Sequence, residues 1–342
     1  MDVAMIYRGD APHPAHKGFA DAIDADLLSL DRYSLPLQSL QHSIPEELLN
    51  GAFLPTYDVY IAEGTRALYG SLTARIGSDS ILIYLVGDMS LYKLLSPSYE
   101  FETLVNQVIS RFGMNALKFT FNRYIDGIIA VSDFSRKYAT EIIKNKPTGV
   151  ANPYVQPELF ERLGEVSPDV RNKTAITVGS YSKYKGQDLL VDAWADVRRE
   201  HPDAKLQLVG KDYPSSFEDE PGVVVHGYVE DLPEVLASSS LYVQPSRVNN
   251  FPVSVLEALR AGLPTIVTNT TGNYTVVRQL GENMVVDPTS TDIASGINRY
   301  FDLSFKDREK LSTTAQTLGS KFDTDSKKQD FKSTFNDVMS EI

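Results

Sequence analysis

The chain has 342 residues, 42% of them hydrophobic, and a net charge of -12 at pH 7. A chain of this length suits two domains better than one core, and one this acidic is not expected to bind nucleic acid. It contains no cysteine, which excludes disulfides, thiolate catalysis and cysteine-based zinc sites.

The first residues, MDVAMIYRGD, lead directly into a predicted strand. They lack the basic region and the long apolar core of a signal peptide. The longest apolar runs, such as ILIYLV at 81–86, have the length of a strand and not of a membrane span. We therefore expect a cytoplasmic protein without transmembrane helices.

Short apolar runs alternate with helix-length amphipathic segments in the first half of the chain. The runs occupy residues 3–7, 59–64, 81–88 and 127–132. Such alternation predicts parallel strands that are buried on both faces and connected by helices. The first half is therefore interpreted as a doubly wound α/β domain.

The segment after the first predicted strand, YRGDAPHPAHKGFADAI, contains Gly9, His13 and His16. In open parallel sheets, ligands bind beyond the carboxyl ends of the strands. The two histidines are candidate substrate ligands, although loop histidines beside prolines are more often solvated.

Asp88 follows a later strand end, in ILIYLVGDMSLY. One interpretation makes it a polar group close to the reacting centre. The other makes it the cap of the next helix, a common position for aspartate.

A local excess of positive charge lies between residues 103 and 146. Seven basic residues face three acidic ones there, and four aromatic residues are interspersed: Phe112, Phe119, Phe121 and Tyr124. A basic amphipathic helix of this kind can lie on an anionic membrane. An ordinary helix that buries its aromatics in the core is an equally good interpretation.

The alternation of strands and helices restarts in the second half. Apolar runs occur at 174–180, 205–210, 223–229, 241–246, 264–268 and 283–287. The stretch 152–172 before them carries three prolines and no clear period, as a linker does. We predict domains at 1–155 and 156–324, and a terminal helix at 325–342 that packs back on the first domain.

No metal site is predicted. Asp24 and Asp26 form an Asp-x-Asp pair, but the pair precedes an apolar run and does not follow a strand. The five histidines are scattered, without the spacing of metal ligands.

Three stretches of the second half have the form of phosphate-binding loops, in which a strand ends at a turn that a helix follows. They are VGSYSKYKGQDLLVDAW at 178–194, VHGYVEDLPEVLASSSLYVQPS at 225–246 and VNNFPVSVLEALRAGLPTIVTN at 248–269. Each motif alone is weak, and the ordered set is specific.

The ordered set resembles the donor half of family-4 glycosyltransferases, also called glycosyl transferases group 1, over roughly residues 175–290. The matching residues are Gly179, Lys185, Gly186, Asp188, Leu190, Gly227, Tyr228, Val229, Pro245, Ser246, Phe251, Pro252, Leu256, Glu257, Ala258, Gly262 and Pro264. The resemblance implies the GT-B fold, in which two Rossmann-like α/β domains face a central cleft. It also implies that the first domain binds the acceptor and the second the donor.

The resemblance further implies retaining transfer of a hexose-type sugar from a nucleotide diphosphate, such as a UDP- or GDP-sugar, with no metal or other cofactor. The acceptor would be a glycan or a lipid-linked glycan, and the protein would lie on the inner face of the membrane near residues 103–146. A catalytically silent nucleotide-sugar or glycan-binding subunit and a nucleotide-sugar epimerase are the alternatives.

The resemblance assigns roles to individual residues. Lys185 would contact the donor phosphates, and Glu257 would accept hydrogen bonds from the ribose hydroxyls. The amides of Asn250 and Phe251, beside Pro252 in the first turn of a helix, would face the diphosphate. The other donor-binding candidates are Gly9, Gly179, Gly227 and Tyr228, and the catalytic candidates are Lys185, Asn249 and Asp88.

Two residues depart from the family pattern. Ser180 stands where relatives usually carry an arginine, so one phosphate cation is missing unless Lys183 reaches in. Asn249 stands where relatives commonly carry the first acid of a Glu-x7-Glu pair. Asparagine cannot ionise but can still hydrogen-bond a sugar hydroxyl, so we expect reduced or altered activity and not a dead site.

Overall fold

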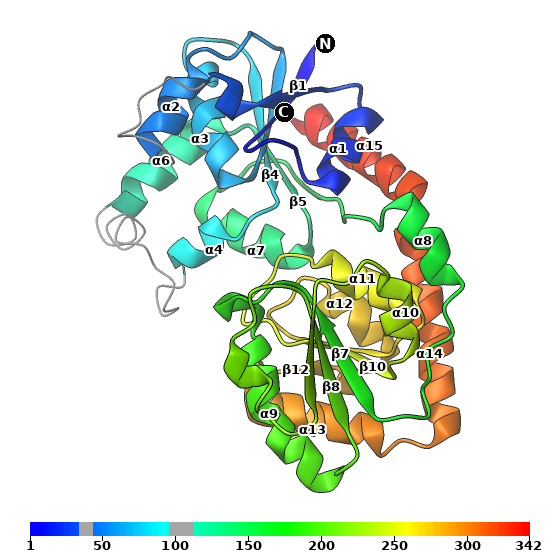
Figure 1. Ribbon diagram of the computed structural model, residues 1–342. Coiled ribbons are helices and arrows are strands. Elements are labelled where there is room, and N and C mark those ends of the chain that lie inside the picture. Colours follow the sequence, from blue (N-terminus) through cyan, green and yellow to red (C-terminus); the bar gives the residue numbers. More distant parts are fainter. Residues whose placement is uncertain (34–43, 96–112) are drawn as a thin grey trace. The chain divides into compact units, whose positions relative to one another are not determined.

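The computed structural model describes residues 1–33, 44–95 and 113–342 of the chain. The chain divides into two compact units (Figure 1). Unit 1 comprises Met1–Pro153 together with Asp325–Ile342, and unit 2 comprises Tyr154–Thr324. Each unit is built on its own six-stranded sheet.

The sheet of unit 1 is parallel throughout and has the order β2-β1-β3-β4-β5-β6. Its strands are β1 (Val3–Tyr7), β2 (Asp26–Ser29), β3 (Val59–Glu63), β4 (Ile81–Val86), β5 (Gly127–Ala130) and β6 (Thr148–Val150). Nearly every residue of β1, β3, β4 and β5 is buried. This burial on both faces explains why these strands are continuous apolar runs in the sequence.

Helices of unit 1 connect these strands and cover the sheet. They are α1 (Pro14–Ala22), α2 (Ile44–Gly51), α3 (Gly64–Arg75), α4 (Ser90–Leu95), α6 (Met114–Tyr124), α7 (Asp133–Ile142) and α15 (Thr324–Glu341), with a 3-10 turn at Leu30–Tyr33. Helix α7 begins with a capping box in which Ser132 and Ser135 bond each other's backbone amides, an arrangement that satisfies two amides at the helix start.

The last helix packs on the sheet of unit 1 although it is far away in the sequence. Phe331 is fully buried, and its ring stacks on that of Phe19 with centroids 4.4 Å apart. Gly127 and Gly149, in β5 and β6, leave the room that the side chains of Val338 and Thr334 occupy. The C-terminal helix is thus part of the hydrophobic core of this unit.

The sheet of unit 2 is also parallel and has the order β12-β11-β10-β7-β8-β9. Its strands are β7 (Thr174–Val178), β8 (Lys205–Val209), β9 (Val223–Gly227), β10 (Leu241–Gln244), β11 (Thr265–Thr268) and β12 (Val285–Val286). The α-helices are α8 (Pro157–Gly164), α9 (Gln187–Glu200), α10 (Leu232–Ala237), α11 (Val253–Arg260), α12 (Tyr274–Val277), α13 (Ser290–Phe301) and α14 (Phe305–Gly319). Short 3-10 turns occupy Lys183–Lys185, Ser215–Phe217, Arg278–Leu280, Glu282–Met284 and Ser320–Phe322.

All ten apolar runs recognised in the sequence form strands, and the predicted pair of doubly wound α/β domains is confirmed. Two short edge strands, β2 and β6, were not predicted, because edge strands are short and only partly apolar. The stretch interpreted as a linker contains a helix, α8, whose Phe160 and Leu163 are buried. That part of the linker interpretation was wrong.

The basic region at 103–146 lies partly outside the described residues, since its first ten residues are not among them. Its described part forms α6, β5 and α7. Phe121 is fully buried, whereas Phe119 is 73% exposed. Phe121 thus fits the interpretation as a core residue, and contact of this region with a membrane stays a prediction.

Candidate functional site

The strand order of unit 2 places a candidate site at the carboxyl ends of β7 and β10. From β7 the chain winds outward through β8 and β9, and it then returns to the other side of β7 as β10. The connections therefore leave β7 and β10 in opposite directions, and in open α/β sheets ligands bind in the crevice at such a switch point. The loops that begin there are residues 179–186 and 245–252.

These two loops touch through their backbones. Gly186 has φ +71, and a Cβ atom added to it would collide with the carbonyl oxygen of Pro245. The amide of Val248 donates to the carbonyl of Tyr184 at 3.2 Å. A glycine is needed at 186 both for the left-handed backbone and for this close approach.

Glu257 lies on α11, the helix that follows the second of these loops. Its neighbours Val255, Leu256, Ala258 and Leu259 are buried and hold the helix against the sheet. The Glu257 side chain is partly buried, and desolvation raises the pKa of its carboxyl to about 7. No group in the described part of the chain hydrogen-bonds this carboxylate, so its acceptor positions are open to a ligand.

Lys185 lies in the first loop, at the end of the turn that precedes α9. Its ammonium donates to the carbonyl of Ser180 at 3.1 Å, and desolvation lowers its pKa. No described carboxylate lies within ion-pair distance of it. A half-buried ammonium without a counter-ion favours binding of an anion.

The missing arginine of the first loop is not replaced by Lys183. The ammonium of Lys183 lies 2.9 Å from the carboxylate of Asp188. Arg247, which follows β10, binds the same carboxylate through two nitrogens at 2.6 and 2.9 Å. Burial raises the pKa of Asp188, but these two cations outweigh burial and lower the pKa below its ordinary value. Lys183 therefore serves an ion pair that fixes the two loops.

The backbone of Asn249 bridges to the loop after β11. Its amide donates to Thr270 at 3.1 Å, and its carbonyl accepts from Gly272 at 2.8 Å. The side-chain amide is partly buried and makes no hydrogen bond to any described residue. The amide group is therefore available for a ligand.

Asn250 and Phe251 are buried at the start of α11. The amide of Phe251 donates to no described group, which suits the predicted contact with a diphosphate. Pro252 is the N-cap residue of α11 and lies just before its first turn, because the helix begins at Val253. Pro252 was predicted to lie in the first turn of this helix, and it lies one residue before that turn.

Glycines end the neighbouring strands at this edge of the sheet. Gly179 has φ +140 and Gly227 φ +67. Gly179 donates to Val209 at 2.7 Å, and Gly210 donates to Gly227 at 2.8 Å. Tyr228, beyond Gly227, is 70% exposed, and the Lys211 ammonium lies 5.2 Å from the centre of its ring.

Sequence reasoning missed a cluster of aromatic residues beside Gly179. The rings of Tyr181, Tyr213 and Phe217 lie 5.6 to 6.3 Å from one another. The Tyr213 hydroxyl donates to the carbonyl of Gly179 at 2.9 Å. The strand-end rule, applied to the run at 205–210, would have found Tyr213 and Phe217.

The predicted site residues of unit 1 lie at the carboxyl edge of their own sheet. Gly9 has φ +97, and its amide donates to Asp31 at 2.9 Å. The carboxylate of Asp88 accepts from the Thr65 amide at 2.5 Å, the Thr65 hydroxyl at 2.9 Å and the Ser90 amide at 2.8 Å. These bonds are those of a helix-capping acid, and a role of Asp88 in chemistry stays a prediction.

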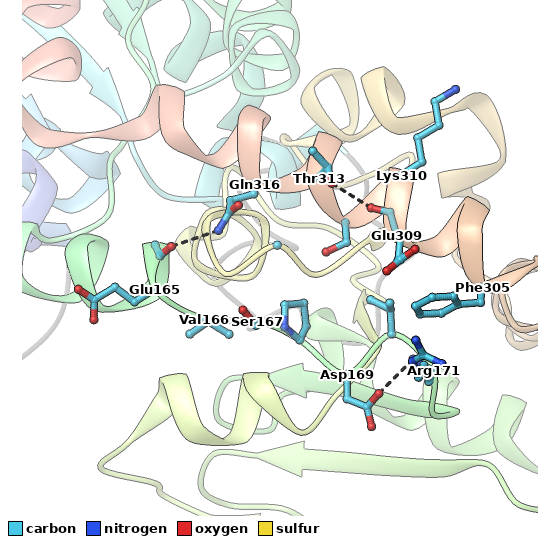
Figure 2. A pocket seen from close by; sticks show the side chains of 15 residues that line it. Glu165, Val166, Ser167, Asp169, Arg171, Phe305, Glu309, Lys310, Thr313 and Gln316 are labelled. Atoms are coloured by element: carbon cyan, nitrogen blue, oxygen red, sulfur yellow. Dashed lines mark hydrogen bonds between the residues drawn. The ribbon is translucent and has the colours of Figure 1, made fainter.

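Figure 2 shows a hollow elsewhere in unit 2, with a volume of about 670 Å³. It is lined by the end of α8, the segment 165–171, Gly262 and helix α14. Residues 165–171 lead into β7 and Gly262 precedes β11, so the hollow lies at the amino edge of the sheet. It contains none of the predicted site residues.

One described group of side chains has the composition of a metal site: Glu200, His201 and Asp302. The Lys173 ammonium lies 3.0 Å from Nδ1 of His201. An ammonium can only donate, so the proton of a neutral imidazole is on Nε2, the atom that faces Asp302. Nε2 then has no lone pair for a metal ion, and we do not assign a metal site here.

Comparison with known proteins shows which family and which solved structures this chain resembles. Residues 161–318 match the family described as glycosyl transferases group 1. An uncharacterized glycosyltransferase of Haemophilus influenzae is 26% identical over 192 residues, which are 53% of this chain and 52% of the relative. The chain spans about half or less of the first curated relatives that it matches.

Solved structures show the same fold over the whole chain. HepE of Anabaena, in complex with UDP and glucose, has a TM-score of 0.71 at 18% identity and covers 100% of both chains. Sucrose-phosphate synthase of Thermosynechococcus elongatus has a TM-score of 0.75 at 14% identity and covers 99% of both. The predicted resemblance to group 1 glycosyltransferases and the predicted GT-B fold are therefore confirmed.

In the described parts of the chain, no helix combines the length and the apolar character that crossing a membrane requires.

Proposed function

We propose, from the match of residues 161–318 to the group 1 glycosyl transferases, that this chain transfers a sugar from a nucleoside diphosphate donor. Unit 2 would bind the donor, as the related family motifs suggest. HepE was crystallised with UDP-glucose, which supports a UDP-sugar as the first donor to test. GDP-sugars remain the second choice.

The observation that carries the proposal is the open carboxylate of Glu257. A carboxylate that loses water without gaining an internal partner costs free energy unless a ligand supplies the missing bonds. The two ribose hydroxyls of a nucleotide can donate to it together. The raised pKa of Glu257, about 7, reflects this incomplete solvation.

Lys185 and the backbone amides at the start of α11 would hold the diphosphate. When the bond from the anomeric carbon to the diphosphate oxygen breaks, its electron pair goes to the diphosphate. A nearby ammonium and backbone amides stabilise that charge. These groups would supply the positive potential that other transferases take from a metal, so no metal is needed for this step.

We further propose retention of anomeric configuration and a reduced or altered rate. Asn249 would hydrogen-bond the transferred sugar where the family commonly has an acid. The ion pair of Lys183 with Asp188 leaves Lys185 as the cation for the phosphates in the first loop. One fewer cation there agrees with a rate below that of family members with the arginine.

The proposed acceptor is a glycan or lipid-linked glycan bound by unit 1, at a membrane surface. Phe119, exposed on α6 beside Lys118 and near Arg123, supports this part of the proposal. An aromatic ring among basic residues suits the interface of an anionic membrane.

Thermal shift and sugar transfer test the proposal together. UDP and GDP are added to the wild type, Glu257→Gln, Lys185→Ala and the control Lys310→Ala, which lines the hollow of Figure 2. A nucleotide at 100 times its Kd should stabilise the wild type and the control by about 2.7 kcal/mol. Glu257→Gln and Lys185→Ala should lose most of that gain.

The transfer of sugar from radiolabelled UDP-glucose to a lipid extract is measured in the same four proteins. The wild type and Lys310→Ala should transfer sugar, and Glu257→Gln and Lys185→Ala should lose most of this activity. Loss of binding in the control as well would contradict the placement of the site. Nucleotide binding without transfer from any donor would contradict the enzyme assignment. Transfer should also persist in EDTA, and its abolition by EDTA would contradict a metal-independent step.

A further inference from the structure

Gln187 is a glutamine that the fold of unit 2 buries almost completely. It is the first residue of α9, directly after Gly186, and it is 1% exposed. Glutamine side chains are mostly exposed, and a buried one needs hydrogen-bonding partners for both ends of its amide. The partners of Gln187 lie in the loop of residues 179–186, which carries Lys185. The proposed function leaves Gln187 without a role.

The side-chain amide of Gln187 binds three backbone groups of that loop. Its Nε2 donates to the carbonyls of Gly179 and Ser180, at 3.3 Å each. Its Oε1 accepts from the backbone amide of Ser182 at 3.4 Å. A carbonyl can only accept and a backbone amide can only donate, so these partners determine which end of the side chain is the nitrogen. Gln187 thus fixes the first half of the loop to the start of α9.

The backbone at Gly179 is also held from the neighbouring strand β8 and the loop after it. The amide of Gly179 donates to the carbonyl of Val209 at 2.7 Å. Its carbonyl accepts from the Tyr213 hydroxyl at 2.9 Å. Desolvation raises the pKa of this hydroxyl, which therefore stays protonated at neutral pH and can donate. A Cβ atom at Gly210 would collide with the carbonyl oxygen of Gly179, so the peptide after Gly179 has little room to move.

The ammonium of Lys185 is bound to this fixed part of the backbone. It donates to the carbonyl of Ser180 at 3.1 Å, and this is the oxygen that Gln187 also binds. The lysine side chain lies beside Gly179, where an added Cβ atom would be 3.4 Å from Nζ. An ammonium has three N–H bonds, and the carbonyl takes one of them. The other two remain for an anion, because no other described group accepts from this ammonium.

Anchoring of the Lys185 ammonium matters because a lysine side chain is flexible. A flexible side chain loses conformational freedom when a ligand fixes it, and this loss weakens binding. The Ser180 carbonyl restricts the ammonium before any ligand arrives. That carbonyl keeps its orientation because Gln187 donates to it. The hydrogen bonds of Gln187 therefore prepare Lys185 for an anion without contacting the anion themselves.

We propose that Gln187 is a positioning residue for the diphosphate of the donor. By holding the Ser180 carbonyl, it directs the ammonium of Lys185 toward the phosphates. The inference rests on the proposed function, in which Lys185 contacts these phosphates. Gln187 acts through Lys185 and contributes nothing to the binding of base or ribose. The affinity for a nucleoside diphosphate therefore depends on Gln187, and the affinity for the nucleoside alone does not.

Two substitutions of Gln187 test this role in different ways. Gln187→Met keeps the length of the side chain and removes its hydrogen bonds. Gln187→Glu can still accept from the Ser182 amide, but it places a carboxylate beside the Lys185 ammonium. The start of a helix favours an acid, so Gln187→Glu should fold and carries the test even if Gln187→Met does not fold.

Gln207→Met is the matched control. Gln207 is another buried glutamine of unit 2, and its Nε2 donates to the hydroxyls of Ser238 and Ser239 at 3.3 Å each. It lies in the middle of β8, whereas the loop of Lys185 follows β7. Its substitution therefore matches that of Gln187 in burial and in lost hydrogen bonds, but it leaves the anchor of Lys185 intact.

The readouts are Kd values from NMR titration of the full chain, for UDP against uridine and for GDP against guanosine. Urea unfolding checks that each variant is folded. Loss of a hydrogen bond to a charged group weakens binding about 10- to 100-fold, and this is the loss expected for the diphosphate in Gln187→Met. Gln187→Glu should lose at least as much, because its carboxylate pairs with Lys185. The Kd for the nucleoside should stay unchanged in both, and Gln207→Met should match the wild type for both ligands.

The outcomes separate this inference from the proposed function. A wild type that binds neither diphosphate would end the proposed function, and this inference with it. A wild type that binds a diphosphate, with Gln187 variants that bind it equally well, would overturn this inference alone. Equal weakening of nucleoside and diphosphate would make Gln187 a structural residue of the loop and overturn it too. So would selective loss of the diphosphate in Gln207→Met, since any buried glutamine would then have this effect.

Discussion

Burial of Glu257 disfavours its ionised form, whereas its proposed function requires that form. Its carboxyl lies in a helix with buried neighbours and has no hydrogen-bonding partner in the parts of the chain that are described. A partly buried acid without a hydrogen-bonding partner destabilises the folded protein, and it strengthens the binding of a ligand that can donate to it. The same arrangement gives a specific pH dependence.

The raised pKa of Glu257 predicts how stability changes with pH. Its folded value of about 7 exceeds the ordinary 4.5, so the folded state binds more protons between these values. The stability that this proton provides is present below about pH 4.5 and is lost as pH rises through 7. The loss is at most about 3 kcal/mol. Urea unfolding of wild type and Glu257→Gln from pH 5 to 8 should show the variant gaining relative stability.

Nucleotide binding should depend on pH in the opposite sense. Ribose hydroxyls donate to the ionised acid, so binding must first remove the proton from Glu257. The Kd for UDP should be about tenfold weaker at pH 6 than at pH 8, from proton competition at a pKa of about 7. Calorimetry in two buffers should detect proton release at pH 6. A Kd independent of pH would contradict the role of Glu257.

Asn249 is predicted to act on the transferred sugar and not on the nucleotide. Its side-chain amide makes no hydrogen bond to a described residue, whereas its backbone amide and its backbone carbonyl are both hydrogen-bonded. Asn249→Ala should lower kcat by about 100- to 1,000-fold, the usual effect of removing one transition-state hydrogen-bond donor. The Kd for UDP should not change. Asn269→Ala, in the exposed loop after β11, is the control, and equal losses in both would contradict the assignment.

At the scale of elements, two loops must touch for the donor site to exist. The approach of the loops after β7 and β10 depends on Gly186, whose missing side chain admits the carbonyl of Pro245. The ion pair of Arg247 with Asp188 joins α9 to the second loop. Lys185 and Asn249 are thus positioned by one shared contact.

Gly186→Ala should therefore separate the two loops. The left-handed backbone alone costs about 1 kcal/mol, and the collision with Pro245 should bring the loss to about 3 kcal/mol or more. Gly77→Ala is the matched control, because Gly77 has φ +82 and open space around the added carbon. Chemical unfolding and UDP titration measure both effects. Equal losses of stability in both variants, with normal UDP binding, would contradict the contact.

At the scale of the whole molecule, the chain closes unit 1 with its last helix. Helix α15 contributes Phe331, Phe335 and Val338 to the buried side chains of that unit. A unit built from two separate segments cannot be completed until both segments are available.

Phe331→Ala should destabilise unit 1 by about 3 to 5 kcal/mol, the cost of removing a buried aromatic ring. The ring that loses its stacking partner is that of Phe19, on α1. Phe119→Ala removes an exposed phenylalanine of the same unit and should change stability by less than about 0.5 kcal/mol. Calorimetry should show the transition of unit 1 shifted to lower temperature only in Phe331→Ala. An equal shift of the second transition would contradict the division into units.

The sequence alone determined the architecture, because its physical cause is local. A strand buried on both faces must be apolar at every position, so runs such as 81–86 are visible without any contact being known. The ordered motifs from Gly179 to Pro264 likewise lie on consecutive strand ends, which predicted where Lys185 and Glu257 occur.

The tertiary structure decided the state of each side chain. Contacts over long separations in the sequence are set by strand order, which the sequence does not display. They bury His16 on Glu63, although it was expected to be solvated, and they engage Asp88 with Thr65. They also join Arg247 to Asp188 and leave the Glu257 carboxylate open. Burial and partners fix proton affinity, and both exist only once the sheet has formed.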